Sequence, residues 1–290
     1  MIKDSIEYLI KTATNPPYSN NVLAARQEYQ MYVGNIFDDD KSYENQMALF
    51  LEWYIFDRID PAHNQTLLEL IINNGKGATL DLLKNINVFI SHIHGLFIIK
   101  KIKDHSVKAI NLFDNKQYDV VEPSGKLYFS KNSIFEGRLL TYENSYYFTG
   151  NFCIHPEGSK KFIKSEIKKI SSVQEINSKE LKLQNIKLKD ENKKLNKTIS
   201  CIEKLQGEIQ GLDSEKKIFK IKNDLSELEP IKKKQEEDYS LLKQNINTRT
   251  HEKIICESQL IQSRLMLKLS SMRLLLERSR NIDLKDIYKN

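Results

Sequence analysis

Cysteine is scarce in this sequence, with Cys153, Cys201 and Cys256 as the only three among 290 residues. They are isolated from one another: no CxxC pair occurs, and no spacing of cysteine and histidine is typical of a zinc site. An odd number of isolated cysteines is typical of a reducing compartment, in which thiols remain unpaired. The sequence therefore predicts no metal and no cofactor.

Long apolar runs are absent as well. No stretch of 18 apolar residues occurs, which argues against a transmembrane helix, and the first 17 residues lack the continuous apolar region of a secretory signal. The sequence contains no GxSxG, cysteine–histidine or paired-carboxylate signature. The loop around Gly75 and Gly77 is too short to be a phosphate-binding GxxxxGK[ST] loop. We therefore expect a non-enzymatic protein of the cytoplasm.

Basic residues are unevenly distributed along the chain, whose net charge is +6. Residues 1–160 contain 16 Lys and Arg against 19 Asp and Glu, whereas residues 161–290 contain 29 against 20. A basic segment can attract nucleic acid, a membrane surface or an acidic protein. Both signs are interspersed along it, however, as on the solvated surface of a helical rod, and we favour this second interpretation.

The last 120 residues carry apolar side chains at seven-residue intervals on an otherwise polar sequence. Such a heptad repeat predicts a coiled coil, because a helix this polar is stabilised mainly by pairing along its apolar stripe. We assign residues 173–280 to this coiled coil. Its predicted core residues are Leu181, Leu188, Leu195, Ile202, Ile209, Ile218, Ile221, Leu225, Leu228, Ile261, Leu265, Leu269, Met272 and Leu276.

Two arrangements of this rod satisfy the pattern. It could be a parallel homodimer, or each chain could fold back near residues 211–214 or at Pro230 into an antiparallel hairpin. Asn185 and Asn192, near the alternate core positions, would fix the register at a cost in stability. The apolar end of the rod, residues 261–280, could dock on the head, pack with a second chain, bind another protein or lie on a membrane.

The residues before the rod predict a globular head of class α+β. Helical spacing and helix-capping residues indicate a helical part over residues 1–94, whose most apolar helix is 43–58. The period changes to two after it, and short strands predict a small antiparallel barrel-like module over residues 95–155. A connecting helix and junction over 156–172 lead to the coiled coil, and a tail covers 281–290. The expected strands are 96–102, 107–113, 118–121, 126–129, 134–142 and 146–152.

Few residues of the head are suited to chemistry. His92 and His94 lie at the predicted helix-to-strand junction, and His155 follows the last predicted strand. An HxH pair can bind a metal, but no third ligand is specified, so we interpret these histidines as structural. Asp57 and Arg58 end the most apolar helix, and we interpret them as an ion pair or a backbone anchor. An enzyme that uses Asp57 with the two histidines is the third-ranked hypothesis.

Several segments of the head resemble an uncharacterised group of bacterial proteins: FLEWYIFDR, TLLEL, HGLFIIKKI, INLFDNKQYDVVE and IFEGRLLTYENSYYFTGNFCIHP. The resemblance spans residues 45–158. Some members of that group carry a C-terminal cysteine-rich metal motif of the SEC-C type, whereas this chain has a predicted coiled coil in its place. The resemblance therefore implies one helix-plus-barrel domain, and it implies neither a metal function nor an established activity.

Together these features predict a structural or adaptor protein, whose head is multimerised, or bound to protein partners, through the C-terminal coiled coil. Both a homo-oligomer and an intramolecular helical hairpin satisfy this expectation. The alternative is a nucleic-acid-binding protein that uses the small barrel and the basic rod. Aromatic residues in the strands favour this alternative, but alternating aromatics more often pack inside a sheet, and the barrel has no basic excess.

Overall fold

The computed structural model describes residues 2–75, 79–122, 130–210, 214–248, 251–279 and 281–289. The chain forms two compact units. Unit 1 consists of residues 1–169 and 261–290, and unit 2 consists of residues 170–260. Unit 1 is therefore built from two segments that are separated in the sequence by the whole of unit 2.

The first half of unit 1 is helical, as the sequence predicts. Thr66 and Glu69 form the expected capping box: the Thr66 side chain accepts from the Glu69 amide, and the Glu69 carboxylate accepts from the Thr66 amide at 2.7 Å. Gly75, at φ 55°, ends the same helix in the left-handed conformation that glycine favours. The elements are α1 (Ile2–Ala13), η1 (Tyr18–Asn21), α2 (Val22–Val33), α3 (Tyr43–Phe56), β1 (Ile59–Asp60), β2 (Gln65–Thr66), α4 (Leu67–Asn74), α5 (Leu80–Val88) and η2 (Phe89–Ser91).

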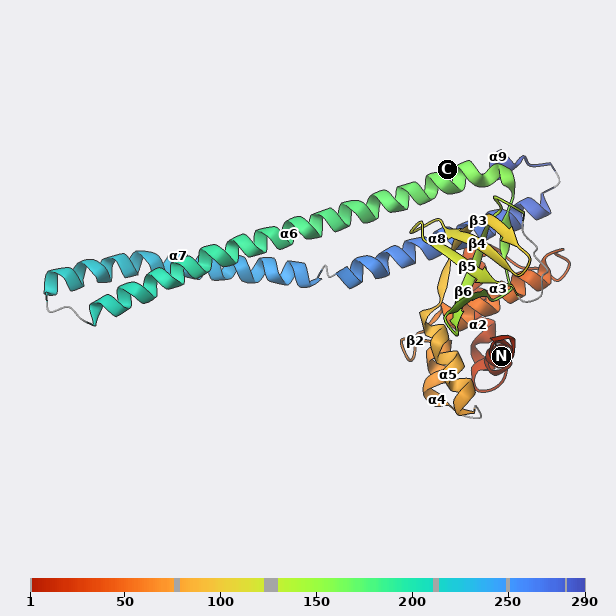
Figure 1. Cartoon of the computed structure of the whole chain (residues 1–290), viewed down its shortest axis with the longest axis horizontal. Coiled ribbons are helices and arrows are strands. Elements are labelled where there is room, and N and C mark those ends of the chain that lie inside the picture. The colour runs from red at the N-terminus through yellow and green to blue at the C-terminus, as the bar shows by residue number, and fades with distance from the viewer. Residues whose placement is uncertain are drawn as a thin grey trace. The chain divides into compact units, whose positions relative to one another are not determined.

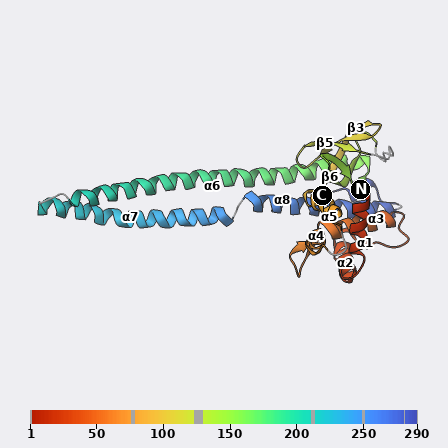
Figure 2. The same ribbon diagram turned by 60° about the horizontal axis from the view of Figure 1, so that its bottom comes forward.

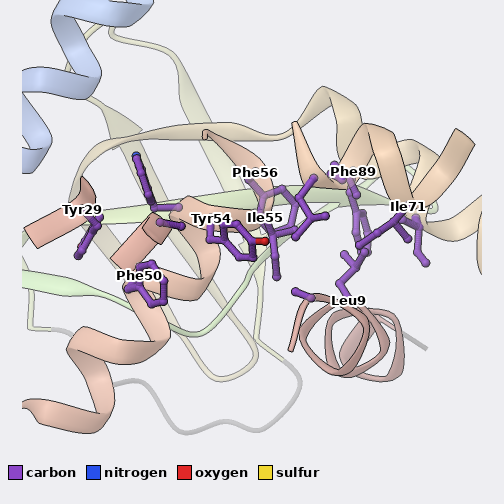
Figure 3. Close-up of a cluster of buried hydrophobic side chains, with 14 of the residues drawn as sticks. Leu9, Tyr29, Phe50, Tyr54, Ile55, Phe56, Ile71 and Phe89 are labelled. Atoms are coloured by element: carbon purple, nitrogen blue, oxygen red, sulfur yellow. The ribbon is translucent and has the colours of Figure 1, made fainter. Parts of the chain in front are cut away.

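Helix α3 lies at the centre of the helical core, which is why its sequence is apolar on almost every side. Phe50 and Ile55 are fully buried, and the rings of Tyr29 and Trp53 pack at a centroid distance of 5.3 Å. Figure 3 shows Leu9 of α1 pointing toward Ile71 and Phe89 beside this helix. Burial of a large apolar side chain contributes roughly 1.5–3 kcal/mol, so this cluster is a main source of stability for unit 1.

A small closed barrel follows the helices. The strands pair in the order β3-β4-β5-β7-β6, and β6 also pairs with β3, which closes the barrel. Most pairs are antiparallel as predicted, but β5 and β7 are parallel, because β7 returns beside β6 and meets β5 on its other side. The predicted strand 126–129 lies outside the described residues. The strands are β3 (Ile93–Lys103), β4 (Ser106–Asn111), β5 (Gln117–Val121), β6 (Ile134–Tyr142), β7 (Ser145–Phe148) and β8 (Cys153–His155), the last paired with β6.

The C-terminal segment 261–289 completes unit 1. It contains the end of α8 (His251–Arg278) and α9 (Leu284–Ile287). Leu265, Leu269 and Leu274 are buried there, and polar contacts fix the segment at its edge. The Ser42 amide donates to the Glu277 carboxylate at 2.9 Å, and Arg278 pairs with Asp40. The sequence left four possibilities open for residues 261–280, and the structure shows the first of them, docking on the head.

Unit 2 consists of helices that run back along one another. Helix α6 (Lys160–Ile209) continues into it without a break, so the end of the predicted connecting segment, 156–172, lies inside a helix. Helix α7 (Glu215–Thr248) returns alongside α6 in both Figure 1 and Figure 2. Pro230 lies inside α7 and does not end it, so the chain does not fold back at this residue, and its side chain faces solvent. Within the described part of the chain, every helix falls short of what a membrane crossing requires.

Candidate functional site

The predicted apolar stripe lies on the least exposed side of α6. Leu195 and Ile202 are buried, with 8% and 6% of their surface exposed, and the flanking heptad positions are half-buried. Less exposed residues recur at alternating intervals of three and four, which is typical of a helix that pairs along a narrow seam. These residues are Leu181, Gln184, Leu188, Glu191, Leu195, Thr198, Ile202, Leu205 and Ile209, and Ile199, next to Thr198, is also half-buried. Asn185 and Asn192 are exposed, so the alternate positions belong to Gln184 and Glu191 instead.

Helix α7 shows the same alternation more sharply. Every residue of α7 outside the stripe is exposed, and the nine residues within it are half-buried. Four residues of α6 between 187 and 194 and four of α7 between 238 and 245 line one shared groove, and the stripe residues Glu191 and Leu242 are among them. The nine residues are Ile218, Ile221, Leu225, Leu228, Lys232, Gln235, Tyr239, Leu242 and Ile246.

The last five predicted stripe residues belong to unit 1. Leu265 and Leu269 are buried, Met272 and Leu276 are half-buried, and Ile261 lies at the edge with 36% of its surface exposed. A heptad pattern shows only that one helix face is apolar, because both a second helix and a globular core can cover such a face. The structure thus divides the predicted residues between two different environments.

Large apolar side chains also lie on the outside of unit 2. Ile176 and Leu183 of α6 are 56% and 58% exposed, and Phe219 and Leu241 of α7 are 67% and 60% exposed. Ile176 and Leu183 are seven residues apart and so lie on one face of α6, on a different side from the stripe. Single exposed apolar residues are ordinary, whereas large contiguous apolar patches mark interaction surfaces.

A cluster of buried charges lies in unit 1, at the junction of α3, β3 and β6. Arg138 of β6 is 1% exposed. It forms ion pairs with Glu52 of α3 and with Asp57, which directly follows the last residue of α3. Its Nη2 donates to Asp57 Oδ2, and its Nε lies 3.6 Å from Glu52 Oε2. Its guanidinium carbon lies 4.7 Å from the centre of the Phe56 ring. Burial raises the pKa of Glu52, whereas Arg138 and His94 overcome the effect of burial and hold the pKa of Asp57 well below its usual range.

His94 links this cluster to the C-terminal segment. Its Nε2 lies 3.0 Å from Glu136 Oε1, its Nδ1 lies 3.5 Å from Asp57 Oδ2, and Ser270 of α8 donates to Glu136 Oε2 at 3.0 Å. Burial and the Arg138 guanidinium lower the pKa of His94, but the two carboxylates outweigh them and raise it to about 9. His94 is therefore charged at neutral pH, and one cation lies between two anions.

The other candidate side chains, His92, His155 and Cys153, differ from His94 in their contacts, and burial sets the direction of their pKa shifts. His92 Nδ1 lies 3.0 Å from the Phe89 carbonyl and its Nε2 lies 3.8 Å from Asp57, while burial lowers its pKa. Burial also lowers the pKa of His155 to about 4, and within the described residues neither of its ring nitrogens has a hydrogen-bond partner. Burial raises the pKa of the Cys153 thiol to about 12, which keeps it protonated and unreactive.

The structure thus brings His92, His94 and Asp57 together, whereas Asp57 and Arg58 have different ion-pair partners. Arg58 Nε donates instead to Glu28 at 2.7 Å. Sequence reasoning missed Glu52, Glu136, Arg138 and Ser270, although the charges inside the apolar run IFEGRLL of β6 were a usable signal. Among the described residues, no group of three or more His, Cys, Asp or Glu side chains is placed to hold a metal. The contacts of the cluster join four elements to one another.

The barrel surface carries a short basic edge. Lys100, Lys101 and Lys103 at the end of β3 are exposed, beside the turn that leads into β4. The rings of Tyr142 and Tyr147, on β6 and β7, are half-buried and contact each other edge to face at 6.5 Å. The ring of Tyr118 packs inside the barrel against Phe97 and Tyr146, as expected for a core aromatic residue. Tyr128 and Phe129 lie outside the described residues.

Comparison with known proteins identifies one family. The model described as "Family of unknown function (DUF7986)" matches residues 9–189, which is more than half of the chain. This agrees with the resemblance of the head to an uncharacterised group of proteins. No curated protein and no solved structure matches the chain.

Proposed function

Because the chain belongs to the DUF7986 family, whose function is unknown, we propose a function from its own structure. The protein is a non-enzymatic adaptor whose helical hairpin, α6 with α7, is an antiparallel coiled coil that pairs with the hairpin of a second copy. The observation that carries this proposal is the alternation of three and four between the less exposed residues on both helices. Such a seam uses one face of each helix, and the remaining faces of α6 and α7 are available for contact with the second copy.

The outer face of α6 provides the surface for the second copy. Ile176 and Leu183 are more than half exposed, and their burial against a partner removes apolar surface from water. The seam itself is partly polar, because Gln184, Glu191 and Gln235 occupy positions in it. A seam of this composition stabilises an isolated hairpin weakly, so assembly with a second copy adds stability.

The charges along this face are self-complementary. If two copies of α6 pair in antiparallel order through the face of Ile176 and Leu183, about a twofold axis at the level of Leu181, Ile176 lies opposite Ile186, Leu183 lies opposite Lys179, and Glu175 lies opposite Lys187. The same axis places Glu180 opposite Lys182. A twofold interface uses one patch twice, so acidic residues on one side of the axis and basic residues on the other attract each other.

Sedimentation of the full-length protein over a range of concentrations tests the proposal. The wild type is expected to form dimers, and the double substitution of Ile176→Asp and Leu183→Asp is expected to leave monomers. Leu80→Asp is the matched control, because Leu80 is 77% exposed on α5 of unit 1 and should not affect assembly. Glu175→Lys and Lys187→Glu should each weaken the dimer and together restore it. A wild type that remains monomeric at every concentration refutes the proposal.

A second candidate function is the binding of single-stranded nucleic acid by the barrel. The closed order β3-β4-β5-β7-β6 is that of a five-stranded Greek-key barrel of the OB type, which often binds oligonucleotides beside the loop between its first two strands. Lys100, Lys101 and Lys103 lie beside the corresponding turn. The fold alone carries no function, so these lysines are the specific support.

Fluorescence anisotropy with a labelled oligothymidine and an RNA of equal length tests this second candidate. Binding to the full-length protein should weaken as salt rises, because phosphate contacts release counterions. Joint replacement of Lys101 and Lys103 by Glu should lower the slope of log affinity against log salt by about 1–2, at roughly 0.7 for each lost phosphate contact. The absence of binding at low salt, or an unchanged slope in the variant, rejects this function for the barrel.

A further inference from the structure

A separate pocket lies within unit 1, on the helical side and away from the charged cluster. It has a volume of about 280 Å³ and is enclosed by η1, the end of α3, the β1–β2 turn and α4. Tyr54 and Leu67 are buried, and with Leu70 they form an apolar surface, while Tyr18 borders it. The volume is that of a site for one small molecule rather than a peptide, because pockets for drug-sized ligands begin at about 300 Å³.

One end of this pocket presents a fixed guanidinium. The side chain of Arg58 is only 10% exposed, and its Nε is held by Glu28 Oε2 at 2.7 Å. Its guanidinium carbon lies 6.0 Å from the centre of the Tyr54 ring, which is also part of the lining. Across the described residues, neither Nη atom of Arg58 has a hydrogen-bond partner. The two Nη donors of a guanidinium match the two oxygens of a carboxylate.

The same pocket contains a carboxylate, that of Asp60, which is 13% exposed. Its Oδ1 accepts from the amides of Ala62 and His63 and lies 2.8 Å from His63 Nδ1. The hydrogen bond with His63 lowers the pKa of Asp60, so the group is ionised at neutral pH. In the part of the chain that the structure describes, Oδ2 has no partner, and Asp60 forms no ion pair with Arg58.

Opposite charges that line one pocket without pairing with each other are complementary to a ligand that carries both. We propose that this pocket binds a small zwitterion, a free α-amino acid with an apolar side chain. The ligand carboxylate accepts from the Nη atoms of Arg58, the ligand ammonium donates to Asp60 Oδ2, and the ligand side chain packs on Tyr54, Leu67 and Leu70. A simple anion would leave Asp60 unsatisfied and would be repelled by it.

Calorimetric titration of the full-length protein with single free amino acids tests the proposal. Leucine, isoleucine, methionine and phenylalanine are the first probes, with glycine and glutamate as poor ligands for the apolar surface. The N-acetyl and carboxamide derivatives of the best ligand remove one charge each, and each should bind at least about tenfold more weakly, because a hydrogen bond between charged groups is involved. Equal binding of the N-acetyl derivative overturns the zwitterion and indicates a site for simple anions.

Two variants of the pocket address the residues separately. Asp60→Asn keeps an oxygen for the turn hydrogen bonds but loses the charge, and Arg58→Lys keeps a charge but loses the paired donors. Each should weaken the best ligand at least about tenfold. Asp81→Asn is the matched control, because Asp81 is 92% exposed on α5 and outside the pocket. If no amino acid binds at millimolar concentration, or if both pocket variants bind as the wild type does, the proposal is wrong.

Discussion

The ion pairs of His94 make the stability of unit 1 sensitive to alkaline pH. The pKa of His94 is raised from 6.5 to about 9 in the folded chain, so between these values the folded state holds a proton that the unfolded state has lost. Its stabilising contribution is complete below pH 6.5 and is lost by about pH 9. A shift of this size corresponds to about 3 kcal/mol. Because 18% of the side chain is exposed to solvent, we expect a loss of about 2–3 kcal/mol.

Trp53 provides the assay, since it is the only tryptophan and is buried in the core of unit 1. Urea unfolding followed by its fluorescence gives the free energy of unfolding of this unit at each pH. The wild type should lose about 2–3 kcal/mol between pH 6.5 and pH 9. His94→Gln should be less stable at pH 6.5 and should lose much less over the same interval.

A control separates His94 from another group that titrates nearby. The pKa of Cys153 is also raised, to about 12, so the unfolded thiol ionises first and adds a loss near pH 9. Cys153→Ala removes this contribution and should keep the slope between pH 6.5 and pH 8.5. If the wild type and His94→Gln show the same dependence on pH, the proposed role of His94 between its two carboxylates is refuted.

Two further changes probe the buried charged and titratable groups of unit 1. Arg138→Met should destabilise unit 1 by about 3–5 kcal/mol, because it removes the buried cation beside Glu52 and one of the cations beside Asp57. Lys108→Met, which removes a surface pair with Asp119, should cost at most about 1 kcal/mol. Equal costs in urea unfolding would contradict this reasoning. Acidification from pH 6.5 to pH 4 should also weaken unit 1, because unfolded His155 takes up a proton that the buried ring, with its pKa lowered to about 4, does not bind. His155→Phe should reduce this slope, and an unchanged slope would assign the acid sensitivity to the carboxylates alone.

Local rules were sufficient for much of the fold. The capping box at Thr66, the central position of α3 and the change of period after residue 94 depend on side chains a few residues apart, which is the range that periodicity and capping describe. The stripe on α6 and α7 was predictable for the same reason. The parallel pairing of β5 with β7 was not, because it joins strands that are not consecutive in the sequence, and local patterns do not show which such strands become neighbours.

The charged cluster lay beyond such rules. Arg138 and Asp57 are 81 residues apart in the sequence, and Glu136 and Ser270 are 134 apart. Alternation within β6 shows which side chains share a face, but it does not identify the element that covers that face. The two histidines were interpreted as structural, and of the carboxylates that contact them Asp57 was named beside them whereas Glu136 was not. Their partners could be recognised only once α3, β6 and α8 were in place.

The C-terminal segment, residues 261–289, packs on the rest of unit 1, and we therefore expect its removal to destabilise this unit. A chain that ends at residue 169 loses the buried side chains of Leu265 and Leu269 and the Ser270 hydroxyl that donates to Glu136. Removal of one large buried side chain costs about 2–5 kcal/mol, and whole domains are stable by only about 5–15 kcal/mol. The family match at residues 9–189 excludes this segment, although the segment belongs to unit 1.

We therefore expect residues 1–169 alone to lack a cooperative unfolding transition by Trp53 fluorescence, although they contain the whole barrel and helices α1–α5. Addition of a peptide of residues 261–290 in excess should restore the transition, because the segment then binds the surface that it covers in the intact chain. The same peptide with Leu269→Asp should fail, since Leu269 is fully buried. A cooperative transition for residues 1–169 with the midpoint of the full-length protein would show that the segment is dispensable for the fold of unit 1.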